Sequence, residues 1–436
     1  MKISIPSLYA IYGRYTDEFR AIPYYLDCLK PVERRVLYAL HKVARKKFAK
    51  SALVVGDTVG KYHPHGDQST YGSLVSLVHR QYAIGQGNFG GISLKKSKAA
   101  AYRYTEVKIN ELVDKLAFEL IDFVDWGDPE NLQFQQPMYL TTPVPLGLIG
   151  EGIISGVSFN VTKIPRYSFP DLIGRLQSLF QNEIDPSHPL KTIIPNIPNF
   201  NIYEDESGDF EKILTKGEGA IVIQPYNSVD RHGFHAYGKP PTGVSQWLKP
   251  NDIFTVDDIS SGEQFEALFT PINNRQITQD FCNYINNVIT SKIHFNCNFV
   301  IKDGTVERKG IDDLLKISYN TWFNNLNKKY EYEKNIILEK LFEMKVISIV
   351  REIINNYNIN LNKIDDIVSI FEQNYKNNHP DVLSDDIRNI CTKHTIKKLI
   401  EYKINEKGLQ MELQDIENTI NNIVTVAYNK MLSYIS

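Results

Sequence analysis

The 436-residue sequence has few cysteines and no long apolar run. Its four cysteines are far apart and include no C-x-x-C pair: Cys28, Cys282, Cys297 and Cys391. This pattern fits reduced thiols, as in a cytoplasm, better than a disulfide or zinc framework. The longest apolar stretch, 144–157, is interrupted by Glu151 and is shorter than the ~20 residues that span a bilayer. With no charged segment and unbroken apolar run at the N-terminus, the sequence predicts a cytoplasmic protein that binds no membrane.

Proline and glycine, at 20 and 25 residues, are too scarce for collagen or a low-complexity chain. Charge, in contrast, is unevenly distributed behind a net value of -2. Residues 1–110 hold 18 Lys and Arg against 7 Asp and Glu, or +11, and the other 31 basic and 44 acidic residues give -13. A basic first quarter is typical of a module that binds a polyanion, although a solvated basic face would have the same charge.

The basic quarter has the spacing of a helix-turn-helix module. Residues 31–47 begin with a proline and carry apolar residues three and four positions apart, which predicts a helix. A short segment and a loop follow over 51–66, and Asp67 is placed to cap a further helix. That helix is expected to bury Tyr71, Leu74, Val75 and Val78. In such a module the last helix presents its N-terminal end to a DNA groove.

The pattern changes further along the chain. Between about 130 and 270, short β-like runs such as 220–224 are separated by Pro, Gly and Asn, which predicts a mixed α/β domain. Apolar residues then recur at helical spacing over 311–357, enough for a helix roughly 70 Å long. A second amphipathic helix near 409–423 is expected to return along it as an antiparallel coiled coil, with a small helical knob between them that could dimerise.

Three glycine-rich stretches have to be weighed as phosphate-binding loops. In 56–62, three residues separate the glycines where a P-loop needs four, and Tyr62 replaces the Ser or Thr that would hold magnesium. The stretch 217–219 is too short a match to carry weight. The stretch 85–91 precedes a patch with Lys95, Lys96 and Lys98, which favours close approach of a phosphate backbone.

His63 and His65 have an H-x-H spacing that metal sites also use. Beyond Asp67, no carboxylate or cysteine cluster accompanies them in the sequence, so phosphate contact is favoured over a metal. The acidic run 204–209 has the side chains of a magnesium site, but its polar, turn-like context favours a solvated loop.

Tyr104 is one of 25 tyrosines, and composition alone would make it a packing residue. A phenol with a pKa near ~10 is a poor nucleophile unless cations stabilise its anion and the phosphorus that it attacks. Arg103 is adjacent, and the histidines and lysines above could converge on the same phosphate. A tyrosyl phosphodiester would conserve the energy of the broken DNA bond, so cleavage would be reversible without a cofactor at that step.

Six blocks, in order and spacing, resemble the breakage-reunion subunit of type IIA DNA topoisomerases, known as the A chain of gyrase and of topoisomerase IV. They are RAIP at 20–23, LKPVERRVLY at 29–38, SALVVGD at 51–57, GKYHPHGD at 60–67, GQGNFG at 85–90 and AAAYRYTE at 99–106. Weaker similarity continues through SGVS at 155–158 and IP at 164–165 to the expected coiled coil.

The resemblance implies that Tyr104 becomes joined to a 5′ phosphate of the cut strand and that Arg103 stabilises the transition state. It implies contacts with the DNA backbone or the scissile phosphate at Arg20, Lys30, Arg34, Arg35, His63 and His65. The basic character of the same region adds Lys42, Lys50 and Lys61 as expected DNA contacts.

Three further positions invite comparison with the family. Ile164 matches the residue that wedges between base pairs, although an isoleucine before proline is otherwise an ordinary core residue. Cys28 stands where the family commonly has Gly, and Glu33 stands where it often has His, so one backbone contact is expected to be lost.

The family's fold implies a multidomain α+β protein. Its parts would be a winged-helix domain with the catalytic tyrosine at 1–130, a tower domain at 131–310, and a coiled coil with a C-terminal dimer gate at 311–436. No β-propeller follows the expected coiled coil, as in compact phage-type enzymes, so relaxation or decatenation is expected rather than negative supercoiling.

Cofactors and partners are expected from the same resemblance. The sequence has no convincing ATPase motif and no acidic magnesium cluster, so ATP and Mg²⁺ are expected on a partner subunit of gyrase B type. The implied assembly is a homodimer that binds double-stranded DNA within an A2B2 heterotetramer, associated with the nucleoid.

Two other classes of protein have to be weighed. A non-cleaving winged-helix clamp or regulator could keep the scaffold, but Arg103 and Tyr104 in their full context argue against it. A tyrosine recombinase would need a scattered Arg-His-Arg framework, of which the sequence gives no sign. The sequence is therefore interpreted as the DNA cleavage-religation subunit of an ATP-dependent type II topoisomerase.

Overall fold

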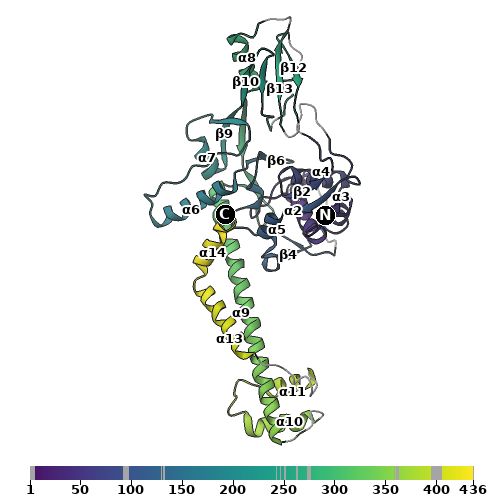
Figure 1. Cartoon of the computed structure of the whole chain (residues 1–436), viewed down its shortest axis with the longest axis vertical. Coiled ribbons are helices and arrows are strands. Elements are labelled where there is room, and N and C mark those ends of the chain that lie inside the picture. The colour runs from purple at the N-terminus through teal and green to yellow at the C-terminus, as the bar shows by residue number, and fades with distance from the viewer. Residues whose placement is uncertain are drawn as a thin grey trace. The chain divides into compact units, whose positions relative to one another are not determined.

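The computed structural model describes most of the chain: residues 5–91, 98–128, 130, 133–241, 243–245, 247–249, 252–261, 264–272, 276–357, 359, 363–393 and 405–435. It divides into two compact units, one of residues 1–325 with 433–436 and one of residues 326–432. Helices and antiparallel strands both build the first unit, which confirms the mixed α/β class (Figure 1).

The first part of the larger unit combines helices with a small antiparallel sheet (Figure 1). Its helices are α1 (Ile5–Thr16), the π-helical turn η1 (Asp17–Ala21), α2 (Pro31–Val43), α3 (Ser51–Lys61), α4 (Asp67–His79) and α5 (Glu111–Phe118). Its strands are β1 (Ala49–Lys50), β2 (Ala83–Gln86) and β3 (Glu106–Ile109), in the order β1-β3-β2. This layout matches the expected succession of helix, short helix, turn and helix.

Helix α2 begins where the sequence predicts, with Pro31 at its first position. The backbone N–H of Lys30 donates to the Glu33 carboxylate at 3.0 Å, so the helix start is closed by its own third residue. Its face with Val36, Leu37 and Leu40 is fully buried in the core of this part.

In α4, Tyr71 and Leu74 are buried as predicted, whereas Val75 and Val78 are only half-buried. Leu77, which the spacing argument omitted, is fully buried instead. The buried stripe is therefore rotated slightly from the one that the sequence predicts.

Two larger antiparallel sheets follow within the same unit. One has the order β6-β7-β14-β9-β8 and is built from Ile153–Val157, Val161–Pro165, Ser291–Asn296, Glu218–Pro225 and Phe200–Glu204. The other has the order β10-β11-β13-β12 and is built from Asn227–Val229, Phe234–Ala236, Ala267–Pro271 and Phe254–Asp258. The predicted strand at 220–224 lies inside β9 and is confirmed.

Three helices accompany these sheets: α6 (Phe169–Ile184), α7 (Asp209–Lys216) and α8 (Gln279–Ile289). Short strand pairs are β4 (Trp126–Gly127) with β5 (Gln136–Pro137), and β15 (Asn298–Val300) with β16 (Val306–Arg308). Arg175 of α6 is fully buried and pairs with Asp312 at 2.7 Å and Glu211 at 3.0 Å. This triad joins α6 and α7 to the start of the long helix that follows, α9 (Ile311–Tyr357).

Helix α9 (Ile311–Tyr357) has the bounds that the sequence predicts and continues into the second unit. In that unit α10 (Ile364–Ile370), the π-helical turn η5 (Phe371–Tyr375) and α11 (Ser384–Lys393) share a hydrophobic cluster with the end of α9. The fully buried Phe371 belongs to this cluster.

The expected return helix is present as α13 (Glu406–Asn421) and α14 (Ile423–Leu432). Lys334 of α9 and Glu417 of α13 form an ion pair at 3.1 Å, which brings the two helices side by side (Figure 1). The predicted heptad residues are all half-buried: Leu409, Leu413, Ile416, Ile420 and Ile423. Half-burial is the expected result for a seam between two helices without a third layer. None of the described helices has the length and apolar composition of a membrane span.

Candidate nucleic-acid interface

Tyr104 lies on an exposed turn just before β3. It is 67% exposed, and the guanidinium of Arg103 lies 4.6 Å from the centre of its ring. The backbone N–H of Tyr104 donates to the carbonyl of Ala101 at 2.9 Å, which closes the turn. The predicted nucleophile is therefore open to a ligand and has a cation beside its ring.

Buried hydrogen bonds to α3 and α4 hold this turn in place. The hydroxyl of Tyr71 on α4 donates to the carbonyl of Ala100 at 2.8 Å and lies 3.0 Å from Oγ1 of Thr105. Thr105, fully buried, donates in turn to the hydroxyl of Ser51 on α3 at 2.8 Å. Helices α3 and α4 thus fix the position of Tyr104, because they hold Ala100 before it and Thr105 after it.

A second anchor reaches the first residue of α4. The hydroxyl of Tyr102 donates to the carboxylate of Asp67 at 2.9 Å, and this hydrogen bond raises the pKa of Tyr102 above its ordinary value. Asp67 comes two residues after His65, the second histidine of the preceding loop. The turn with the tyrosine and the loop with the histidines are therefore attached to the same helix end.

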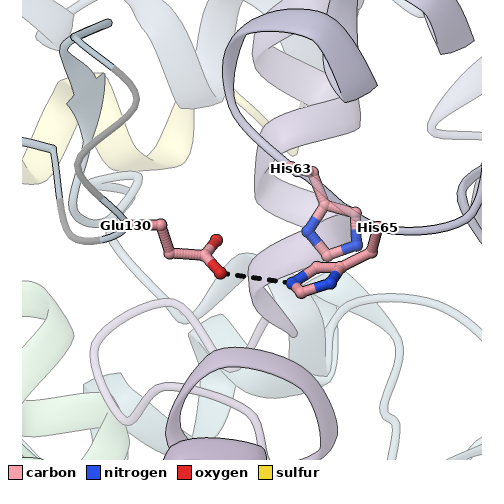
Figure 2. Close-up of side chains that lie close together, drawn as sticks. All are labelled: His63, His65 and Glu130. Atoms are coloured by element: carbon pink, nitrogen blue, oxygen red, sulfur yellow. Dashed lines mark hydrogen bonds and ion pairs between the residues drawn. The ribbon is translucent and has the colours of Figure 1, made fainter.

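His63 and His65 lie edge to face, with ring centres 4.4 Å apart, and a carboxylate approaches them (Figure 2). That carboxylate belongs to Glu130, whose Oε1 lies 3.2 Å from Nε2 of His65. Nδ1 of His63 lies 2.7 Å from Nη1 of Arg35, and Nδ1 of His65 lies 3.1 Å from Nη2 of Arg20. We call Arg20, Arg35, His63 and His65 the arginine-histidine cluster, and Glu130 is the carboxylate that contacts it.

The arginines fix the tautomers of both histidines. A guanidinium can only donate, so Nδ1 of His63 and Nδ1 of His65 must accept, and in each neutral ring the proton is on Nε2. Burial together with Arg35 and the other ring lowers the pKa of His63 to about 3, and burial and Arg20 also lower the pKa of His65. Near neutral pH both rings are therefore uncharged and offer N–H donors.

The cluster also bears on whether His63 and His65 bind a metal ion. Glu130 supplies the carboxylate that the sequence did not place near the histidines, and His63, His65 and Glu130 have ligand atoms within 4.8 Å of one another. A metal needs an unprotonated ring nitrogen, however, and here both Nδ1 atoms are engaged while both Nε2 atoms carry protons. With Arg20 and Arg35 adjacent, the cluster fits an anion rather than a cation.

A surface pocket of about 480 Å³ opens beside the cluster. Its walls are Arg20, Val32, His63, His65, Gly66, Ser69 and Ser73. The pocket combines a guanidinium, imidazole rings and serine hydroxyls, and all of these can donate hydrogen bonds to phosphate oxygens.

The structure separates the remaining predicted DNA contacts into exposed and buried groups. Lys42 is exposed on α2, with its Nζ 5.4 Å from the ring centre of Tyr38. Lys50 and Lys61 are also accessible but pair with Glu106 at 2.7 Å and Asp57 at 2.5 Å. Among these three lysines, Lys42 is the one whose described contacts include no acidic side chain.

Lys30 and Arg34 are held by the protein itself. Nζ of Lys30 donates to the carbonyl of Ser155 at 2.6 Å, and burial lowers its pKa. Arg34 is buried against the fully buried Asp27, with Nε 2.6 Å from Oδ2 and Nη2 2.9 Å from Oδ1. Both ends of the Arg34 guanidinium fork are taken by this carboxylate, so a direct contact of Arg34 with DNA stays a prediction.

Ile164 is likewise not at the surface. It is fully buried in β7, paired with Ile154 of β6, and so occupies the core position that an isoleucine before proline ordinarily takes. Insertion between base pairs stays a prediction for Ile164, and it would require the residues that cover this face of the sheet to move away.

The two departures from the family pattern have structural explanations. Cys28 has a φ of 55°, in the left-handed region that favours glycine, and its side chain is fully buried. Glu33 is buried, closes the start of α2 and accepts from Nη2 of Arg80 at 2.7 Å. Glu33 is therefore a structural carboxylate that pairs with an arginine of this chain.

Three minor expectations can also be placed. The glycine-rich stretch 56–62 is mostly helical, within α3, so it forms no phosphate loop. The acidic run 204–209 forms a turn in which Glu204 accepts backbone N–H groups of Gly208 and Phe210 at 3.2 and 2.8 Å. Asp209 in this run is buried, not solvated as expected. Lys95 and Lys96 lie outside the described residues.

Sequence comparison connects this site with known proteins. The family model of the DNA gyrase/topoisomerase IV A chain matches residues 20–236. The gyrase A chain of Buchnera aphidicola subsp. Acyrthosiphon pisum is 27% identical over 98% of this chain and 54% of its own length. Its Helicobacter pylori (strain ATCC 700392 / 26695) counterpart is 27% identical over 85% of this chain and 46% of its own. Against the Pseudomonas aeruginosa counterpart, identity is 37% over 47% of this chain and 23% of the relative. The chain spans about half the length of the Buchnera and Helicobacter relatives.

Proposed function

The chain belongs to the family of DNA gyrase and topoisomerase IV A chains, and we propose that it is the DNA cleavage-reunion subunit of a type II topoisomerase. The observation that carries this proposal is the exposed Tyr104 beside the guanidinium of Arg103. Its turn is attached to the same helix end as the loop of His63 and His65, whose cluster can donate hydrogen bonds to an anion. A nucleophile and phosphate donors on one rigid support are what phosphodiester cleavage requires.

In the proposed reaction, Oη of Tyr104 loses its proton and bonds to a DNA phosphorus. The bond from phosphorus to O3′ breaks, O3′ takes up a proton, and the 5′ phosphate stays on the tyrosine. Arg103 stabilises the charge that develops on the phosphoryl oxygens. Reversal of the same steps reseals the strand, because the phosphotyrosine retains the energy of the phosphodiester.

We propose that each predicted basic residue has one of two roles. Arg20, His63 and His65 line a pocket and donate to phosphate oxygens. The buried Arg35 beside His63 adds positive charge to that site. Lys42, Lys50 and Lys61 lie at the surface and attract the DNA backbone without reading bases. Lys30 and Arg34 support the fold beneath them.

Magnesium and ATP are proposed to bind to a partner subunit of gyrase B type, in an A2B2 assembly on a homodimer. Among the described residues, one group of three ligating side chains lies close enough to hold an ion. The two histidines of that group have their protons on Nε2, and an N–H group donates to an anion. Bound magnesium would supply charge stabilisation to the phosphate and the leaving oxygen. Every step assigned to this chain uses its own tyrosine, arginines and histidines.

The domain organisation is proposed on the same basis. Residues 1–130 would form the winged-helix domain, 131–310 the tower, and 311–436 the coiled coil with a dimer gate. The small β1-β3-β2 sheet beside α2, α3 and α4 supports the first assignment, and the ion pair between α9 and α13 supports the third. Four buried free cysteines support the proposal that the protein acts in the cytoplasm, on nucleoid DNA.

Relaxation or decatenation is the proposed outcome of strand passage. Residues 111–436 carry a net charge of -13, which disfavours a second surface on which DNA could wrap. A plasmid assay tests this directly, because negative supercoiling of a relaxed circle would contradict it.

The decisive experiment for the proposed function traps the cleaved state. The chain is mixed with a gyrase B-type partner, magnesium, ATP and supercoiled plasmid, and the mixture is then denatured. We expect linear DNA covalently attached to this chain, and none from the Tyr104→Phe variant. The alternative, a non-cleaving clamp, would bind the plasmid and leave no adduct in either case.

A further inference from the structure

A carboxylate of this chain occupies the donors that the proposed function assigns to a DNA phosphate. Glu130 lies between β4 and β5, and its side chain is only 4% exposed. Figure 2 shows it directed at the histidine pair from outside their loop. No expectation drawn from the sequence included this residue.

Glu130 is bound by three groups. Its Oε2 lies 2.6 Å from Nη1 of Arg35, and its Oε1 accepts from the hydroxyl of Tyr15 at 2.8 Å and from Nε2 of His65 at 3.2 Å. A carboxylate held by a guanidinium, an imidazole N–H and a hydroxyl has the contacts that a phosphodiester oxygen would make.

Charge balance explains why an anion is present there. Arg35 is 3% exposed in its side chain, and Arg20 approaches the same pair of rings. Both histidines are neutral near pH 7, and Glu130 is a carboxylate in direct contact with Arg35 and His65 of this cluster. A buried guanidinium without such a partner would be costly, so in the absence of DNA the cluster needs an internal anion.

We propose that Glu130 is an internal competitor for the DNA phosphate, bound to Arg35 and His65 until a backbone phosphate takes its place. This inference rests on the proposed function and adds a regulation of its site. Two anions of the same charge cannot both occupy the donors, so the affinity for DNA is reduced by the fraction of molecules in which Glu130 holds them. A duplex held by other contacts would overcome this competition more readily than a stray phosphate.

The test measures DNA affinity without cleavage. The full chain carrying Tyr104→Phe is titrated with a duplex, with and without Glu130→Gln. Removing the competitor is expected to tighten binding about ten-fold. The matched control is Glu183→Gln, which removes an equal charge from an exposed pair with Lys316 and should change affinity less than about two-fold. Unchanged or weaker binding by Glu130→Gln would overturn the proposal and make Glu130 a residue that positions Arg35.

A second variant guards against misfolding of the first. Tyr15→Phe removes one hydrogen bond to Glu130 and leaves the ion pair with Arg35 in place. It is expected to tighten DNA binding about three-fold, because the lost hydrogen bond contributes less than ~1 kcal/mol. If Glu130→Gln does not fold, an unchanged affinity of Tyr15→Phe would overturn the proposal.

Inorganic phosphate separates this inference from the proposed function. Phosphate should raise the melting temperature of Glu130→Gln more than that of the wild-type chain, because the vacated donors bind it. Equal responses would show that Glu130 does not occupy an anion site. A chain that binds no DNA at all would defeat the proposed function, and the phosphate titration would then decide the role of Glu130 alone.

Discussion

Arg34 and Asp27 form a two-point ion pair in the interior of the larger unit, with contacts of 2.6 and 2.9 Å. Asp27 is fully buried and also accepts the backbone N–H groups of Leu29 at 3.1 Å and Leu140 at 3.0 Å. The pair therefore ties the loop before α2 to a segment more than a hundred residues away. It gives a structural reason for an arginine that a basic surface alone would not explain.

Breaking this pair should destabilise the fold. In Asp27→Ala the guanidinium of Arg34 remains buried without its partner, so the free energy of unfolding should fall by about 3–5 kcal/mol. Urea denaturation measures the loss. Lys42→Ala, an exposed substitution on the same helix as Arg34, should cost less than about 0.5 kcal/mol. Equal midpoints for the two variants would contradict the structural role of Arg34.

Glu33 and Arg80 should be energetically coupled. Burial raises the pKa of the Glu33 carboxyl, but the charges of Arg80, Arg166 and Lys30 outweigh burial and hold it below its ordinary value. Glu33→Gln and Arg80→Met should each destabilise the protein, and together cost less than the sum by about 1–3 kcal/mol. Additive losses in the double-mutant cycle would mean that Glu33 acts only through the start of α2.

Stability should depend on pH through His63. Its pKa is lowered to about 3 in the folded protein, against ~6.5 in an unfolded chain. Below pH ~6.5 the unfolded chain takes up a proton that the folded chain does not, so stability is complete above that pH and is lost as pH falls toward the folded value. The loss from this group at pH 5 is about 2 kcal/mol.

His63→Gln should remove this contribution. Between pH 7 and 5, the unfolding free energy of the variant should decline by about 2 kcal/mol less than that of the wild type, measured by urea denaturation at each pH. Parallel curves would mean that the pKa of His63 is the same in the folded and unfolded chain, and so would contradict the lowered value.

Lys42 should contribute to DNA affinity through charge alone. Its amine is exposed on α2 and contacts the Tyr38 ring. Lys42→Ala should weaken binding several-fold at low salt and reduce the slope of log K against log salt by about 0.9, the value for one phosphate contact. Lys42→Arg is the matched control and should retain the slope. An unchanged slope for Lys42→Ala would remove this residue from the interface.

Patterns local in sequence predicted much of the fold. The spacing that defines α9 and the proline that begins α2 act within one or two helical turns, so both starts could be read from the chain. The residues with heptad spacing in the return helix are all half-buried, and that spacing is readable because it lies within one helix. The break near Asn422 between α13 and α14 had no such local signal.

The site was predictable in part. Histidines two residues apart and a tyrosine beside an arginine are visible as motifs, and the structure places them at one helix end. Glu130 and Asp27 were missed, because their partners are 65 and 7 residues away and neither carboxylate belongs to a motif. The burial of Arg34 follows from Asp27, and so could not be foreseen without it.

The central claim is that Tyr104 is the residue that DNA joins. Trypsin cuts after Lys98, Arg103 and Lys108, so Tyr102 and Tyr104 fall in separate short peptides. The denatured adduct of the full chain is trimmed with nuclease, digested with trypsin and analysed by tandem mass spectrometry. The account predicts a nucleotide 5′-phosphate on the peptide 104–108 and an unmodified peptide 99–103. A nucleotide on any other tyrosine, or an adduct that persists in Tyr104→Phe, would contradict it.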